Sequence, residues 1–239
     1  MSQVQPIVIT GGARRIGLAL TQHFVSLGQP IIISYRTRYP VISELEQAGV
    51  CCIAADFSTD EGVLDFARQI KEQSPAGLRA IIHNASQWIA EGGATSDADV
   101  MAAMLQIHVR TPYLLNQQLA GITGTDEPAS GDIVHFTDYV VERGSDKHIA
   151  YAASKAALDN LTRSFAIKLA PRIKVNAIAP SLIMFNPQDD DQYRQKALDK
   201  SLMKIAPGEQ EIIHLVDYLL SSKYATGRTF AVDGGRHLR

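Results

Sequence analysis

The chain of 239 residues has only two cysteines, Cys51 and Cys52, and they are adjacent. Neighbouring residues of a strand point to opposite faces, so these two are poorly placed to bridge each other. No further cysteine is available for a zinc site or a disulfide framework. We therefore expect two reduced, mostly buried thiols and no metal centre.

Long apolar runs and an excess of one charge are also missing. No stretch approaches the roughly 20 apolar residues of a membrane span, and the first residues lack the basic and apolar regions of a secretory signal. Lys plus Arg is 23 and Asp plus Glu is 25, which gives no general attraction to nucleic acid or to anionic membranes. We expect a cytoplasmic protein that acts on a small molecule, with no nucleic acid or membrane as partner.

What the chain does contain is a regular alternation of short β-branched runs and amphipathic segments. Runs such as residues 31–33 show no polar alternation, as expected for strands with both faces buried. The pattern predicts an α/β fold, a single Rossmann-type doubly wound domain over residues 1–239 with a seven-stranded parallel sheet and helices on both faces. Strands are expected at residues 6–10, 31–33, 50–55, 78–83, 133–136, 173–178 and 229–232, and helices at 14–27, 41–48, 97–119, 151–169 and 212–220, with a further helix beginning at a capping box in residues 58–61.

One connection is much longer than the others. Residues 181–208 contain two prolines and the acidic run 189–191. A solvated surface excursion is one interpretation. The other is a substrate lid, because long insertions in compact domains often cover sites.

A glycine-rich segment follows the first expected strand. Residues 10–17, TGGARRIG, lie between that strand and the first expected helix, which is the position of a dinucleotide-binding loop. Glycines let the backbone approach a pyrophosphate, and the helix N-terminus offers free N–H groups and a partial positive charge. A tight packing turn is the alternative, but the context favours nucleotide binding. The residues expected to take part are Gly11, Arg14, Arg15, Ile16 and Gly17.

The segment after the second expected strand indicates which nucleotide. A carboxylate there would accept a hydrogen bond from the ribose 2′-hydroxyl of NAD. This chain has Tyr35, Arg36, Thr37 and Arg38 and no acidic residue. Guanidinium groups of Arg14 and Arg36 would hold a 2′-phosphate instead, although a solvated basic edge is the alternative. We therefore expect the cofactor to be NADPH.

A tyrosine and a lysine four residues apart begin the helix after the fifth expected strand. At this spacing Tyr151 and Lys155 share one helix face. An ammonium group stabilises a nearby phenolate, so we expect Lys155 to lower the pKa of Tyr151 and to suit it to proton transfer.

Together these motifs make the chain similar, essentially end to end, to the short-chain dehydrogenase/reductase family. The resemblance implies one Rossmann-type domain, usually in a homotetramer, that moves hydride to or from a nicotinamide. It rests on residues 10–17, Asp56 after the third strand, Asn84 and Ala85 after the fourth, Tyr151 with Lys155, and the segments 176–180 (NAIAP) and 232–235 (VDGG).

The departures from the family's usual pattern resemble its pteridine reductase branch. Arg15 replaces a loop glycine, Asp138 replaces the serine thirteen residues before the tyrosine, and Ser86 and Trp88 follow the fourth strand. The resemblance implies Asp138, Tyr151 and Lys155 as the catalytic set. His108 stands where many relatives carry an asparagine that supports a proton-relay water.

These residue types also suit a pterin, which is a flat, electron-poor bicycle. Trp88 can stack on one face, Arg15 and Ser86 can bond the ring edge, and Asp138 can accept from ring N–H groups or pass a proton with Tyr151. The alternatives are a core or interface position for Trp88 and a turn-capping role for Asp138.

The expected reaction is the NADPH-dependent reduction of a 7,8-dihydropterin, such as dihydromonapterin or dihydrofolate. Hydride adds to C6 of the N5=C6 bond, and a proton reaches N5 from Tyr151, Asp138 or a water that they hold. The resemblance implies further cofactor contacts from Asp56, Phe57, Asn84, Ala85, Pro180, Ser181 and Leu182.

Two other functions stay open. One is reduction of another carbonyl, such as a 3-oxoacyl thioester or a sugar ketone. Asp138 argues against it, because a carbonyl oxygen that gains charge prefers a hydroxyl donor to a carboxylate. The other is a non-catalytic NADP-binding regulator on the same fold, against which Tyr151 and Lys155 count.

Overall fold

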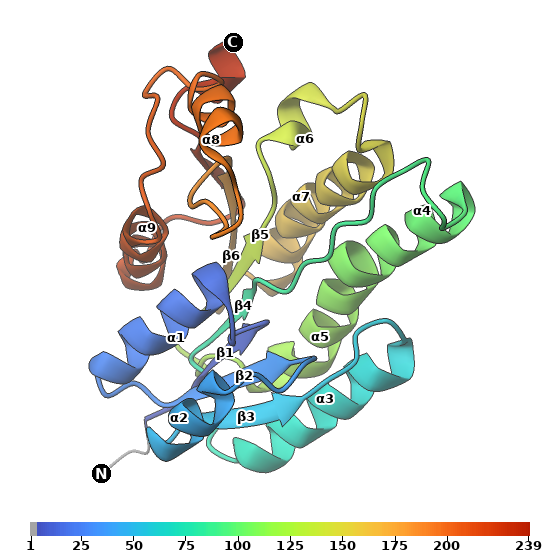
Figure 1. The fold of residues 1–239 in the computed structure, drawn as a ribbon. Helices are drawn as coiled ribbons and strands as arrows, with labels where there is room; N and C mark the ends of the chain where they lie inside the picture. The colour runs from blue at the N-terminus through green and yellow to red at the C-terminus, as the bar shows by residue number, and fades with distance from the viewer. Residues whose placement is uncertain (1–3) are drawn as a thin grey trace.

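The β-branched runs form one sheet in this computed structural model, which describes residues 4–239 (Figure 1). Within these residues the sheet has seven strands in the order β3-β2-β1-β4-β5-β6-β7, and every neighbouring pair is parallel. The predicted sheet is thereby confirmed. The strands are β1 (Ile7–Thr10), β2 (Ile31–Tyr35), β3 (Cys51–Ala54), β4 (Ala80–His83), β5 (Gly131–Phe136), β6 (Ile173–Pro180) and β7 (Thr229–Val232).

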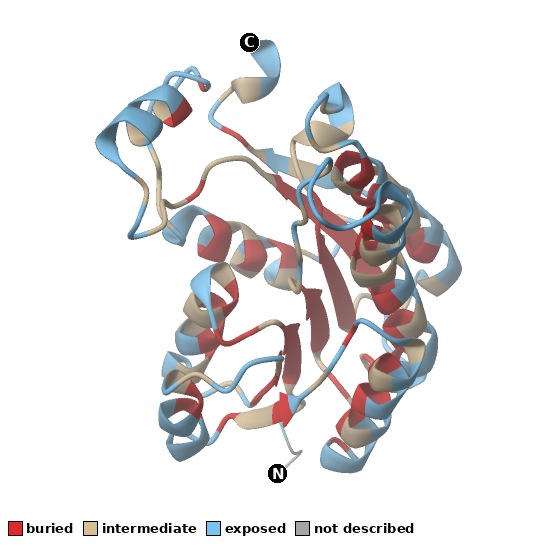
Figure 2. Ribbon diagram, turned by 45° about the vertical axis from the view of Figure 1, so that its right-hand side comes forward, coloured by how far each residue is buried: buried red, intermediate tan, exposed pale blue. Residues whose placement is uncertain are grey.

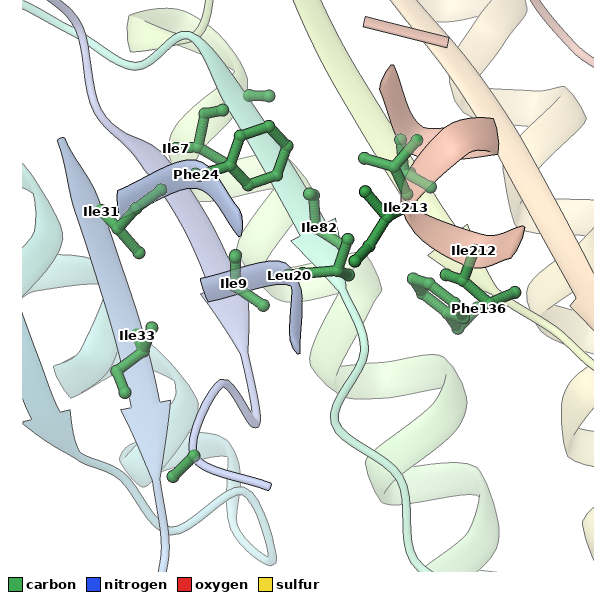
Figure 3. Close-up of a cluster of buried hydrophobic side chains, with 14 of the residues drawn as sticks. Ile7, Ile9, Leu20, Phe24, Ile31, Ile33, Ile82, Phe136, Ile212 and Ile213 are labelled. Atoms are coloured by element: carbon green, nitrogen blue, oxygen red, sulfur yellow. The ribbon is translucent and has the colours of Figure 1, made fainter. Parts of the chain in front are cut away.

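Two helical layers cover the sheet, because successive strand residues point to opposite faces. Ile7 and Ile9 pack with α1 (Arg15–Ser26), α2 (Val41–Gln47) and α9 (Gln210–Ser221), in the cluster of Figure 3. Val8, between them, packs on the other face with α3 (Asp60–Gln73), α5 (Thr111–Leu119) and α7 (Ile149–Leu169). Figure 2 shows the result as a buried central sheet inside helices whose outer sides are exposed.

The adjacent cysteines follow the same alternation. Cys51 packs against the cluster that contains Val8, and Cys52 against the cluster that contains Ile7. Both are free thiols, half-buried rather than mostly buried, and burial raises the pKa of each, that of Cys52 to about 11. The expectation of two unbridged thiols is confirmed.

The helix expected at residues 97–119 contains an irregular turn. It consists of α4 (Asp97–Leu105), a π-helical turn η1 (Gln106–Arg110) and α5. The hydroxyl of Thr111 donates to the carbonyl of Gln106 at 2.9 Å, which gives this carbonyl of the widened turn a hydrogen-bond partner. One added residue shifts the apolar spacing at a single point, so the expectation of one continuous helix did not include the π turn.

Other short elements were not anticipated. They are α6 (Val140–Arg143), α8 (Asp191–Leu198) and the 3-10 turns η2 (Ala120–Ile122) and η3 (Arg236–Leu238). The expected capping box also shifts by one residue: Thr59, not Ser58, is the N-cap of α3, and its side chain accepts from the N–H of Gly62 at 3.1 Å.

The long connection at residues 181–208 packs against the C-terminal tail. The N–H of Met203 donates to the carbonyl of Gly234 at 3.1 Å, and Arg239 donates to the carbonyl of Asp199 at 2.7 Å. Helix α8 and the C-terminal turn lie beside each other in Figure 1. Across residues 4–239, the helices are too short or too polar to cross a bilayer.

Candidate active site

From β1 the sheet continues through β2 and β3, and from β4 it continues in the opposite direction through β5, β6 and β7. This reversal of strand order places a crevice between β1 and β4. Ligands of doubly wound sheets bind at such a point, outside the carboxyl ends of the strands. A cavity of about 630 Å³ lies there. The predicted site residues that line it are Gly11, Arg14, Arg15, Ile16, Tyr35, Arg36, Thr37, Asp56, Phe57, Asn84, Ala85, Ser86, Asp138, Tyr151, Lys155 and Pro180.

The glycine loop brings bare backbone to the cavity. Gly11 has a φ of +67°, and a Cβ there would lie 3.1 Å from the Cα of Ala85. Gly17 does not line the cavity; a Cβ on it would lie 2.2 Å from the carbonyl oxygen of Gly11, so this glycine lets α1 pack against the loop. Helix α1 has neither a side-chain cap nor an acidic residue in its first turn. Its N-terminus therefore fits an anionic group such as a pyrophosphate.

Arg15 connects the glycine loop to the long connection. Its backbone is left-handed, with a φ of 50°, a conformation that favours glycine. The guanidinium donates to the side-chain oxygen of Asn186 and to the carbonyl of Met184, the latter at 3.3 Å. Residues 181–208 are thus tied to the cavity wall.

The arginines after β2 divide into two kinds. Arg38 makes two hydrogen bonds to the carboxylate of Glu46, at 2.6 and 3.0 Å, and does not line the cavity. Arg36 lines it and is exposed, and within residues 4–239 its side chain makes one long hydrogen bond, to Gln87 at 3.5 Å. Arg14 is oriented by a 2.9 Å hydrogen bond to the hydroxyl of Tyr39. Arg14 and Arg36 therefore both line the cavity, and Arg38 does not.

The crevice is held together by polar bonds between β1 and β4. The Thr10 hydroxyl accepts from the N–H groups of Asn84 and Ala85, both at 3.0 Å. The side-chain amide of Asn84 donates to the carbonyls of Thr10 and Gly11 at 3.1 and 3.0 Å. Asp56, beyond β3, accepts from the N–H of Ser58 at 2.9 Å, which lowers the pKa of its carboxyl group.

The proposed catalytic residues meet at the end of β5. The hydroxyl of Tyr151 donates to Oδ2 of Asp138 at 2.9 Å, and Oδ1 of Asp138 accepts from the N–H of Val140 at 3.0 Å. The ammonium of Lys155 donates to the carbonyl of Phe136 at 2.7 Å. Asp138 thus fixes the turn into α6 and accepts a hydrogen bond from Tyr151, while its part in proton transfer stays a prediction.

Protonation in this group differs from one expectation. Burial and the negative charge of Asp138 raise the pKa of Tyr151 well above its usual value, so the expected lowering by Lys155 is wrong for this geometry. Burial also raises the pKa of Asp138 and lowers that of Lys155, the latter to about 8. The tyrosine is therefore a protonated phenol, which can donate a proton but cannot accept one.

A second polar chain lies behind Tyr151. The hydroxyl of Ser86 lies 2.8 Å from Nε2 of His108, and Nδ1 of His108 lies 2.9 Å from the hydroxyl of Ser154, which donates to the carbonyl of Tyr151 at 2.7 Å. His108 belongs to the π turn and is buried. Sequence reasoning missed Ser154; its place three residues after Tyr151, one helical turn away, was the available signal.

Besides Gly17, three predicted residues do not line the cavity. Trp88 is 55% exposed and packs edge-on against the ring of His148, with centroids 4.9 Å apart, so a core position for it is wrong. Ser181 accepts a hydrogen bond from Arg236 at 3.0 Å, and neither it nor Leu182 reaches the cavity wall. The loop that carries Trp88 is anchored by Glu91, which accepts from the first N–H groups of α7.

Comparison with known proteins places this geometry among reductases. Residues 11–237 match the family described as enoyl-(acyl carrier protein) reductase. The chain is 68% identical over 238 residues to the dihydromonapterin reductase of Citrobacter koseri and 65% identical to that of Escherichia coli K12, covering 100% of this chain and 99% of each relative.

Solved structures agree with this placement. FolM alternative dihydrofolate reductase 1 from Brucella canis, complexed with NADP, has a TM-score of 0.87 and 28% identity, covering 100% of this chain and 96% of that one. The Pseudomonas aeruginosa RhlG/NADP complex has a TM-score of 0.85 and 25% identity, covering 99% and 98%.

Proposed function

The chain belongs to the short-chain dehydrogenase/reductase family, and we propose that within it the protein reduces a 7,8-dihydropterin to the tetrahydro form with NADPH. Dihydromonapterin and dihydrofolate are the substrates that the names of its relatives support. The observation that carries the proposal is the contact between the Asp138 carboxylate and the Tyr151 hydroxyl in the cavity wall.

The residues of the cavity fit NADPH. The unblocked N-terminus of α1 and the bare backbone at Gly11 would hold the pyrophosphate. Arg14 and Arg36 would hold the 2′-phosphate, and Asp56 and Phe57 would border the adenine. Asn84, Ala85 and Pro180 would line the nicotinamide half, with Lys155 on its ribose. Bound NADPH supplies the hydride that adds to C6 of the substrate.

The protein's own contribution is a proton for N5. Tyr151 is a protonated phenol whose hydroxyl points at Asp138, and burial raises the pKa of the Asp138 carboxyl group above its usual value. When N5 gains electron density, Tyr151 gives its proton directly or through a water, while Lys155 holds the nicotinamide ribose. Asp138 also offers a carboxylate to the N–H groups of the pterin edge.

Asp138 separates this reaction from reduction of an ordinary ketone. Both of its oxygens already accept hydrogen bonds, from Tyr151 and Val140. A ketone oxygen that gains negative charge would meet this carboxylate where it needs a donor. A pterin presents N–H groups, which suit the carboxylate.

Residues 181–208 act as the substrate lid over a single domain of residues 1–239. Their tie to Arg15 in the cavity wall supports this role, because the lid then borders the side chain at C6 that distinguishes one dihydropterin from another. Trp88 stacks on the substrate from the loop before α4, while Arg15 and Ser86 bond its edge. By family resemblance the protein works as a homotetramer in the cytoplasm, in tetrahydropterin and one-carbon metabolism, with no nucleic acid as partner.

The test is a steady-state assay of NADPH oxidation with dihydromonapterin, dihydrofolate and dihydrobiopterin, alongside a 3-oxoacyl thioester and a sugar ketone. We expect turnover with the dihydropterins. A preference of kcat/KM for either carbonyl substrate would contradict the proposed function, and NADPH binding without any turnover would favour the regulator.

A further inference from the structure

The polar chain Ser86–His108–Ser154 has a direction, because each hydroxyl has one hydrogen to donate. The carbonyl of Tyr151 can only accept, so the hydrogen of Ser154 is committed to it at 2.7 Å. The oxygen of Ser154 must then accept from Nδ1 of His108, 2.9 Å away. The hydrogen of the imidazole is thereby placed on Nδ1.

The second ring nitrogen completes the argument. A neutral imidazole has one N–H, so with Nδ1 protonated, Nε2 of His108 is an acceptor. The hydroxyl of Ser86, 2.8 Å away, therefore donates its only hydrogen to His108. Burial and the nearby ammonium of Lys155 keep the ring neutral, lowering the pKa of His108 to about 2.

The lone pairs of the Ser86 oxygen are left for a ligand in the cavity. Ser86 is exposed and lines the cavity, and its hydroxyl makes no other hydrogen bond within residues 4–239. Its hydrogen is used, so only oxygen lone pairs are left. We infer that His108, oriented by Ser154, fixes Ser86 as a hydrogen-bond acceptor and so selects ligands that present an N–H or O–H group at that point of the cavity.

This inference deepens the proposed function and rests on it for the identity of the ligand. A pterin edge carries an amino group and a ring N–H, and either could meet the Ser86 oxygen; a ligand that presents a carbonyl there would leave two acceptors facing each other. His108 is a positioning residue in this scheme, since it acts through Ser86, and Ser154 is one step further removed.

The first test finds the proton on His108 in the full-length protein without ligand. Long-range nitrogen–proton NMR correlations distinguish the two imidazole tautomers in protein labelled at its histidine nitrogens. The His108 signals are identified by their loss in His108→Asn. We expect hydrogen on Nδ1 and a bare Nε2. A hydrogen on Nε2, or on both nitrogens near neutral pH, would overturn the inference.

The second test measures selectivity in the enzyme–NADP⁺ complex. Dissociation constants are compared for pterin, for lumazine, in which a carbonyl replaces the 2-amino group, and for 3-methylpterin, in which a methyl group blocks the ring N–H. We expect at least one change to weaken binding to the wild type by about tenfold. The same change should cost less than about threefold in Ser86→Ala and in Ser154→Ala.

Ser154→Ala makes this test specific. Ser154 is fully buried and does not line the cavity, so a purely structural defect would weaken all three ligands alike and leave their ratios intact. Ser164→Ala, an exposed serine on the same helix, is the matched control and should keep the wild-type ratios. Wild-type ratios in Ser154→Ala would overturn the inference. If no dihydropterin is reduced at all, the proposed function fails, but the NMR result still decides how Ser86 is oriented.

Discussion

Cofactor preference can be tested with two arginines that are close in sequence but differ in their surroundings. Arg36 lines the cavity and is nearly free, whereas Arg38 is paired with Glu46 and lies outside the cavity wall. The change is Arg36→Ser, with Arg38→Ser as its matched control. Each variant removes one positive charge from the same segment. A difference in cofactor preference between them therefore reflects where the charge lies, not the change in net charge.

The magnitude follows from the exposure of Arg36. A hydrogen bond to a charged group contributes about 1.5–3 kcal/mol when buried, but Arg36 is exposed, so solvent screening reduces this to about 1–2 kcal/mol. We expect kcat/KM for NADPH to fall by roughly 5- to 30-fold in Arg36→Ser. The value for NADH should stay near the wild-type one, because NADH has no phosphate for Arg36 to bind.

The assay is the ratio of kcat/KM for NADPH and NADH, measured for the wild type and both variants at low and high salt. High salt should bring the wild-type ratio closer to one, since salt screens the attraction between Arg36 and the 2′-phosphate. Arg38→Ser should keep the wild-type ratio. The reasoning is refuted if Arg36→Ser keeps it too, or if both variants lose it equally.

Four further outcomes are expected. Tyr151→Phe should retain NADPH affinity, measured by titration, and lose turnover by roughly 10²–10⁴-fold, as an enzyme does without its acid; near-normal kcat would exclude Tyr151 from proton transfer. Asp138→Ser should lower kcat/KM for dihydropterins by at least about tenfold with unchanged NADPH affinity, and equal activity would leave Asp138 as a turn residue only. Trp88→Ala should raise the substrate KM several-fold with little change in melting temperature, because the side chain is 55% exposed and stacking contributes about 0.5–1.5 kcal/mol; an unchanged KM would contradict stacking. Finally, burial lowers the pKa of His83 from 6.5 to about 4, so the unfolded chain takes up this proton before the folded protein does as the pH falls. Between those pH values His83 should therefore lower the free energy of unfolding by about 3 kcal/mol. Denaturant melts of His83→Gln should show a smaller loss of this free energy over the same pH range.

The sheet and its layers could be predicted because burial on both faces leaves a direct mark on the sequence. Strands such as residues 31–33 are apolar throughout, and the helices that cover them show one apolar side. The π turn around His108 left no such mark, since a single added residue hardly disturbs the apolar spacing of α4 and α5. Helix α6 is four residues long and has no buried residue, so no periodicity could indicate it.

The site was predictable where a residue's type and its place at a strand end determine its role. The cavity gathers most of the predicted residues for that reason. The pairing of Arg38 with Glu46 and the exposure of Trp88 depend on side-chain packing between distant segments, which the sequence alone does not show. The shift in the pKa of Tyr151 was predicted with the wrong sign because burial and the charge of Asp138 raise this pKa, and neither can be read from the spacing of Tyr151 and Lys155.

The left-handed backbone at Arg15 has a consequence for engineering. A side chain in this conformation costs about 1 kcal/mol relative to glycine, so stability alone favours glycine at this position. Glycine would also remove the guanidinium that ties the glycine loop to Asn186 and Met184. Relief of the backbone strain and loss of this tie therefore act in opposite directions on stability. In a search for heat-tolerant variants, Arg15→Gly would test the anchoring of residues 181–208 as well as the strain.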